Sequence, residues 1–160
     1  RDSPVFMELK KKYRSIVYKR RLTLPYDRAL DCLTGACPWP ETQIGGEIRY
    51  TVDFYPDLES RVFLAYERDS WLAPESGLRI TFDDAIRFRT EELTLDSDPW
   101  GTALLGPDQV LMELKAPGAI PLWMVRLLTE MRLYKTSFSK YGTAYQLLLE
   151  REWKGGKRYA

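Results

Sequence analysis

The chain has 160 residues, a length that favours one domain with its own hydrophobic core. It contains 24 Lys and Arg, 23 Asp and Glu and no His, and its formal net charge of +1 does not by itself predict a polyanionic partner. The absence of His excludes the usual general base and the usual catalytic triads, so chemistry here must use carboxylates, Lys, Arg and a metal. No apolar run in the sequence approaches the roughly 20 residues that span a bilayer.

Positive charge is concentrated near the start of the chain. Residues 1–21 carry eight Lys or Arg and two Asp or Glu, whereas the remaining residues carry 16 and 21. A localised basic surface follows from this division, and such surfaces bind phosphate groups.

Apolar and charged residues alternate over residues 5–13 and again over 16–24, which predicts two strands that form a β-hairpin. Its charged face should hold Glu8, Lys10, Lys12, Lys19 and Arg21. Arg20 has the opposite parity, and we expect it to be solvated or packed along its stem.

Two helices are predicted next, over residues 25–34 and 44–55. The first has Pro25 at its start and a stripe of Ala29, Leu30 and Leu33. The second segment is ambiguous, because its apolar spacing fits a helix while its composition fits a strand; we favour the helix.

Cys32 and Cys37 are the two cysteines of the chain. Without His, a zinc site would need carboxylates to complete it, which is unusual. We expect two half-buried free thiols in a reducing cytoplasm.

The second half of the chain reads as strands followed by helices. Residues 61–71 predict a strand, 77–89 a further strand pair, and 110–115 a strand that repeats the first charged pattern. Residues 121–133 predict an amphipathic helix that begins at Pro121 and buries Leu122, Val125 and Leu128, and another helix ends the region 134–152. Residues 154–160 are expected to be a frayed tail, and no domain boundary is visible within residues 1–160.

Charged faces recur on the predicted strands 5–13, 16–24, 61–69, 78–83, 86–89 and 110–115. Two interpretations are open: these faces are solvated, or the strands form a barrel with the charged faces inward. An inward ring of Lys and Arg would suit a multiply charged anion, with carboxylates left to hold a divalent metal. Arg87 and Arg89 could line either wall, and Asp83 is expected to orient Arg79 or a neighbour rather than bind metal.

The successive motifs are "FMELKKKY", "VYKRR", "YERDSW", "GLRITFDDAIRFR", "MELKAPGAIPLW" and "TSFSKYGTAY". In this order they resemble the VTC domain, the polyphosphate polymerase domain of the vacuolar transporter chaperone complex, which has bacterial relatives. That family is part of the triphosphate tunnel metalloenzymes, or CYTH-like superfamily. The resemblance runs from residue 4 to about residue 145.

The resemblance implies an α+β fold with an antiparallel β-barrel or tunnel and flanking helices. It implies transfer of the γ-phosphoryl group of ATP onto a polyphosphate chain, with Mn²⁺ or Mg²⁺. By the same resemblance the catalytic residues are Lys19, Arg21, Arg68, Arg79 and Lys140. The phosphate-binding residues are Lys10, Lys12, Lys19, Arg21, Arg68, Arg79, Lys115 and Lys140. The metal ligand is Glu113, with Glu8 as a weaker candidate.

Family members carry earlier tunnel strands, which we expect to lie outside this chain. That expectation keeps two alternatives open, a non-catalytic module that binds polyphosphate or triphosphate, and a triphosphate hydrolase. A nucleic-acid partner is not expected, because no RNA-recognition motif is visible. We expect a cytoplasmic location, with a fused or partner membrane protein as an open alternative.

Overall fold

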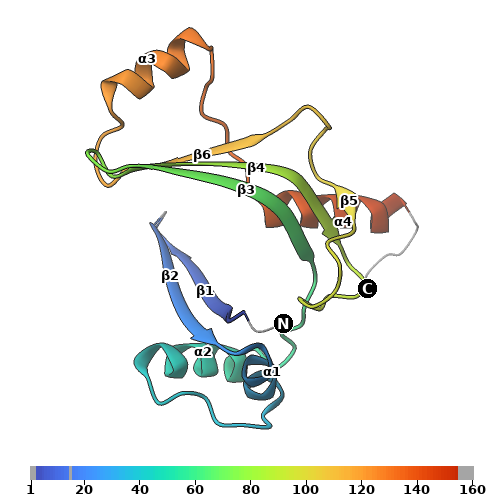
Figure 1. Ribbon diagram of the computed structural model, residues 1–160. Coiled ribbons are helices and arrows are strands. Elements are labelled where there is room, and N and C mark those ends of the chain that lie inside the picture. Colours follow the sequence, from blue (N-terminus) through green and yellow to red (C-terminus); the bar gives the residue numbers. More distant parts are fainter. Residues whose placement is uncertain (1–2, 15, 155–160) are drawn as a thin grey trace. The chain divides into compact units, whose positions relative to one another are not determined.

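The computed structural model describes residues 3–14 and 16–154, and of Lys12 and residues 151–154 it describes only the backbone. The chain divides into two compact units, Arg1–Glu59 and Ser60–Ala160. Both combine antiparallel strands with helices, so the α+β class is confirmed (Figure 1).

The first unit is a hairpin with two helices packed near the end where Val5 pairs with Leu24 (Figure 1). Strand β1 (Val5–Tyr13) pairs with β2 (Ile16–Leu24) in a register that places Glu8 opposite Arg21 and Lys10 opposite Lys19. Directly opposed residues of an antiparallel pair share a face, so the predicted basic face is confirmed.

Helices α1 (Tyr26–Thr34) and α2 (Gln43–Phe54) confirm both helical predictions. The ambiguity over 44–55 is resolved at the N-terminus of α2, where the Thr42 hydroxyl accepts the Gly45 N–H at 3.0 Å. Such a cap satisfies a donor that a helix otherwise leaves without a partner.

The core of the first unit consists of Leu24, Ala29 and Cys32, with apolar residues of the hairpin packed against it. The predicted stripe on α1 is therefore partly wrong: Leu30 and Leu33 are exposed, because Cys32 faces the hairpin beside Ala29. Both cysteines are free thiols, as expected, and Cys37 is partly buried; Cys32 is fully buried and not half-buried, because it belongs to the core.

The second unit is built around the long strand β4 (Leu78–Arg89). Strand β3 (Phe63–Ala73) pairs along one edge, and the other edge is shared by β6 (Leu111–Lys115) and β5 (Thr102–Ala103). Gly77, with φ of 63°, closes the tight turn into β4, and a Cβ at this position would lie 3.1 Å from the Pro117 ring.

The prediction of a strand pair over 77–89 is wrong, because one strand carries the whole segment. The alternation breaks at a β-bulge, not at a turn. The pairs Ala65–Arg87 and Glu67–Asp84 leave one extra residue on β4, and Ala85 there has φ of 44°. A bulge of this kind changes which face the following side chains occupy.

Helix α3 (Leu122–Glu130) begins directly after Pro121, and α4 (Lys140–Lys154) follows. The predicted buried face of α3 is partly wrong, since Met124 is buried while Leu122 and Val125 are exposed. The tail was predicted over residues 154–160. Of these, Lys154 is the last residue of α4, and residues 155–160 lie outside the described residues. None of the helices within the described ranges combines the length and apolar character of a membrane span.

Candidate functional site

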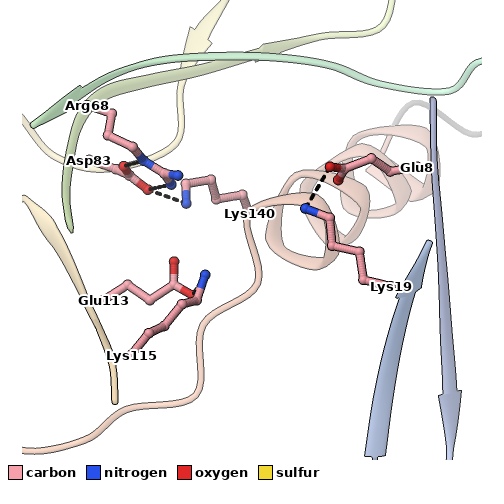
Figure 2. A network of polar contacts seen from close by, with 7 residues as sticks. All are labelled: Glu8, Lys19, Arg68, Asp83, Glu113, Lys115 and Lys140. Atoms are coloured by element: carbon pink, nitrogen blue, oxygen red, sulfur yellow. Dashed lines mark hydrogen bonds and ion pairs between the residues drawn. The ribbon is translucent and has the colours of Figure 1, made fainter. Parts of the chain in front are cut away.

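The basic face of the hairpin is organised around Glu8. The Lys19 ammonium lies 2.6 Å from Glu8 Oε1 (Figure 2). Arg21 donates to the same oxygen through Nε at 2.6 Å. Burial raises the pKa of Glu8, but the hydrogen bonds and charges of Lys19 and Arg21 outweigh burial and hold it below its ordinary value. Glu8 is therefore ionised at neutral pH, and both cations keep donors for a further anion.

The other predicted residues of this hairpin differ in their surroundings. Lys10 lies opposite Lys19 on the same face and is exposed. The side chain of Lys12 lies outside the described residues. Arg20 is on the opposite face, where its Nε lies 3.3 Å from Glu47 of α2. The basic residues of the hairpin thus have two kinds of surroundings: Lys19 and Arg21 surround Glu8 on one face, and Arg20 pairs with Glu47 on the other.

A second cluster surrounds Asp83 in the middle of β4. Arg68 of β3 lies directly opposite and binds both carboxylate oxygens, through Nε at 2.5 Å and Nη2 at 2.7 Å. Lys140, the first residue of α4, forms an ion pair with Asp83 Oδ2 (Figure 2). The Asp83 side chain is fully buried, whereas 36% of the Arg68 side chain and 16% of the Lys140 side chain are exposed.

The electrostatics of this cluster keep the Asp83 carboxylate and the Arg68 guanidinium charged. Burial raises the pKa of Asp83, but hydrogen bonds and charges from Arg68 and Lys140 outweigh it, and the pKa lies below its ordinary value. The hydrogen bond to Asp83 in turn raises the pKa of Arg68. Arg68 and Lys140 also contact the ring of Tyr66, at 4.9 and 4.8 Å from its centroid.

Glu113 and Lys115 of β6 lie on the same face of the sheet. The pairs Thr81–Glu113 and Arg79–Lys115 establish this, because Thr81 and Arg79 alternate with Asp83 along β4. The Lys115 ammonium lies 2.9 Å from Glu113 Oε1. Its hydrogen bond lowers the pKa of Glu113, burial opposes this, and the charges of Lys140 and Arg68 lower it further. Glu113 is thus an ionised carboxylate within the field of the Asp83 cluster.

Three arginines of β4 have different environments. Arg79 is exposed on the Asp83 face and has no ion pair among the residues that the structure describes. Arg87 is turned to the opposite face by the bulge, where it lines a cavity of about 460 Å³ together with Glu67 and Asp84. Arg89 is buried and donates to backbone carbonyls of the loop that follows β4. Of the three, only Arg79 is placed to bind an anion on the Asp83 face.

The donor set suits a metal that is held partly by phosphate oxygens. Within the described ranges there is no group of three His, Cys, Asp or Glu side chains that could hold an ion alone. Mg²⁺ and similar ions are commonly bound by one or two carboxylates plus substrate phosphates. Glu113 fits this pattern, because its carboxylate is ionised and 41% exposed. Glu8 fits less well, since Oε1 is already shared by two cations.

The central position of Asp83 is the feature that the sequence showed least clearly. It was expected to orient Arg79 or a neighbour, and the structure confirms the neighbour and not Arg79. Tyr66 was missed entirely. Its spacing of two from Arg68 puts both on one strand face, and this alternation was the available signal.

Antiparallel strand faces that carry Lys and Arg around ionised carboxylates are an arrangement that suits phosphorylated anions. The family model of the VTC domain matches residues 1–149. The chain belongs to the VTC domain family, which is related to polyphosphate polymerases, and the CYTH-like superfamily is consistent with this. A search of the curated proteins found no match, and neither did a search of the solved structures.

Proposed function

We propose that this chain is a metal-dependent polyphosphate polymerase domain, which transfers the γ-phosphoryl group of ATP onto a polyphosphate chain in a basic tunnel. The observation that supports this most is the charged face of the β3–β4–β6 sheet. There Arg68, Arg79 and Lys115 share a face with Glu113, an ionised carboxylate that is 41% exposed, and Lys140 of α4 pairs with Asp83 on the same face. Membership of the VTC family supports the same substrate class.

Phosphoryl transfer asks a protein mainly to position its substrate and to stabilise charge on the phosphoryl oxygens. Arginine offers a planar fork to phosphate, and lysine offers a compact point charge. The cations that we propose to contact the reacting phosphates are Lys19, Arg21, Arg68, Arg79 and Lys140. Further phosphate contacts are proposed for Lys10, Lys12 and Lys115. We also propose that charged strand faces of this kind form the tunnel wall.

Glu113 is the residue that we propose to hold Mn²⁺ or Mg²⁺, and Glu8 is a weaker candidate. Such an ion would be held by the Glu113 carboxylate and would neutralise charge on the phosphate groups of the substrate. Lys115 keeps Glu113 ionised and orients its carboxylate, so the residue is ready to bind a cation without first losing a proton.

The test is conversion of ATP to polyphosphate by the purified chain, with Mn²⁺ and with a chelator. We expect chain formation that requires the metal and that Arg79→Ala reduces at least tenfold. Arg87→Ala is the matched control, because this exposed arginine lies on the opposite face of the same strand. Phosphate release without chains would indicate a hydrolase, and saturable tripolyphosphate binding without product would indicate a binding module. Either result would reject the polymerase.

A further inference from the structure

Asp83 is a buried carboxylate at the centre of a face otherwise rich in cations. It is fully buried, yet Arg68 and Lys140, which it binds, both reach solvent. An isolated buried charge is very unfavourable, so a carboxylate at this position requires partners. Its two oxygens receive three contacts from these two side chains.

We propose that Asp83 is a positioning residue, which holds Arg68 and Lys140 side by side so that their remaining donors address the same phosphoryl group. This inference rests on the proposed phosphoryl-transfer function and deepens it. Asp83 itself would not touch the substrate, because its buried oxygens are already occupied by the two cations.

The geometry assigns the donors. Arg68 uses its Nε and Nη2 edge for Asp83, and Nη1 has no hydrogen-bond partner among the residues that the structure describes. Lys140 shares Oδ2 with Arg68 Nη2, so the two positive nitrogens are neighbours. An ammonium group carries further N–H bonds beyond the one directed at Asp83. The end of Arg68 and the free side of Lys140 therefore form a paired donor set.

The Tyr66 ring restrains the same two cations from a second direction, because both lie within about 5 Å of its centroid. Long side chains lose rotamer freedom when they bind, and this loss opposes binding. Restraint before the substrate arrives removes part of that cost and improves orientation in the transition state.

The negative charge of Asp83 should have opposite effects on the orientation of the two cations and on their affinity for an anion. Two adjacent cations repel, and the carboxylate between them offsets this repulsion while it lowers the positive charge that an anion meets. Asp83→Asn keeps the shape but removes the negative charge. We expect this variant to bind tripolyphosphate at least as tightly as wild type and to have a kcat lower by about tenfold or more.

A purely structural role of Asp83 would give different binding and kcat values. Variants of Arg79 distinguish a positioning role from a structural one. Arg79 lies on the same face but makes no contact with Asp83. If Asp83 acts through Arg68, then Arg79→Ala should weaken tripolyphosphate binding by the same factor in wild type and in Asp83→Asn. Arg68→Ala should lower kcat much less in Asp83→Asn than in wild type. If the substitution disrupts the whole face, the effect of Arg79→Ala should disappear as well.

The experiment combines kcat, KM and tripolyphosphate affinity for wild type, Asp83→Asn, Arg79→Ala, Arg68→Ala and the double variants. Asp84→Asn is the matched control, since Asp84 is exposed on the opposite face. Arg68→Lys is a second variant that keeps the charge but cannot bind Asp83 with two nitrogens, and it should show the same fall in kcat. Unchanged kcat in both Asp83→Asn and Arg68→Lys would overturn the proposal, and so would loss of the Arg79 effect.

A readout without turnover distinguishes this proposal from the polymerase. The Nε–H resonance of Arg68 should shift when tripolyphosphate binds to wild type, and this shift should be much reduced in Asp83→Asn. An inactive wild type with these NMR effects would reject the polymerase and support positioning by Asp83. An active wild type whose kcat is unchanged by Asp83→Asn would support the polymerase and reject positioning by Asp83.

Discussion

Glu8 and Arg21 lie directly opposite each other on β1 and β2, and the guanidinium donates to the carboxylate at 2.6 Å. With Lys19 they form a group of one carboxylate, one arginine and one lysine. Asp83 forms a group of the same composition with Arg68 and Lys140. Each carboxylate reduces repulsion between adjacent cations, so positive side chains can be held close together before an anion binds.

The stability of the chain should fall in acid because of Asp83, Glu8 and Glu113. Their folded-state pKa values lie below the ordinary values of 3.8 for Asp and 4.5 for Glu. A carboxylate whose pKa is depressed on folding stabilises the folded state when the pH is above the ordinary pKa of the group. This contribution is lost as the pH falls through the folded-state pKa. Urea unfolding between pH 7 and pH 2 should show the loss below about pH 4.5.

Asp83→Asn should make this acid loss shallower and should cost about 2 kcal/mol at pH 7. This is less than the roughly 3–5 kcal/mol for breaking a fully buried pair, because Arg68 reaches solvent. Asp84→Asn, which changes an exposed carboxylate, should leave the pH profile as in wild type. Identical acid profiles for the two variants would contradict the assigned role of Asp83 in stability.

Adjacent arginines on β2 should respond differently to substitution. Arg21→Ala should weaken tripolyphosphate binding several-fold, because Arg21 lies on the basic face with Lys10 and Lys19. Arg20→Ala should leave binding unchanged and lower stability by at most about 1 kcal/mol, since it removes a half-exposed ion pair with Glu47. Calorimetric titration and thermal melting of both variants provide the measurement. Equal effects on binding would argue against separate roles for the two faces.

Glu113→Gln should reduce the affinity for Mn²⁺ in the presence of tripolyphosphate by tenfold or more, because it removes an ionised ligand. Removal of metal by a chelator should abolish activity in wild type. Glu67→Gln is the control, since Glu67 is an exposed carboxylate that lines the cavity on the opposite face. Metal titration followed by calorimetry gives both affinities, and a Glu113→Gln protein with wild-type affinity would exclude Glu113 as the ligand.

Arg89 should be essential for stability and not for phosphate binding. It is 4% exposed and donates to the carbonyls of Glu91, Glu92, Asp98 and Trp100. Arg89→Ala leaves several of these acceptors without a donor, and we expect a loss of about 3 kcal/mol. Urea unfolding of Arg87→Ala, an exposed neighbour, should change by about 0.5 kcal/mol or less. A small loss for Arg89→Ala would show that water replaces the guanidinium.

The sequence by itself determined the elements whose patterns are local. The hairpin with Lys10, Lys19 and Arg21 on one face follows from alternation, which extended backbone geometry imposes on any strand. The start of α3 after Pro121 follows from the fixed φ of proline. The family resemblance, read from long motifs in order, was confirmed over residues 1–149.

The tertiary structure decided which of these charged residues meet. Lys140 reaches Asp83 from a helix that is distant in sequence, and no local pattern specifies that contact. The bulge at Ala85 turns Arg87 away from Arg79, although a simple alternation would keep them on one face. Side-chain direction along a strand has a period of two, so one inserted residue reverses every later position. Whether a residue is inserted depends on how the neighbouring strands pair, and that is a property of the folded sheet.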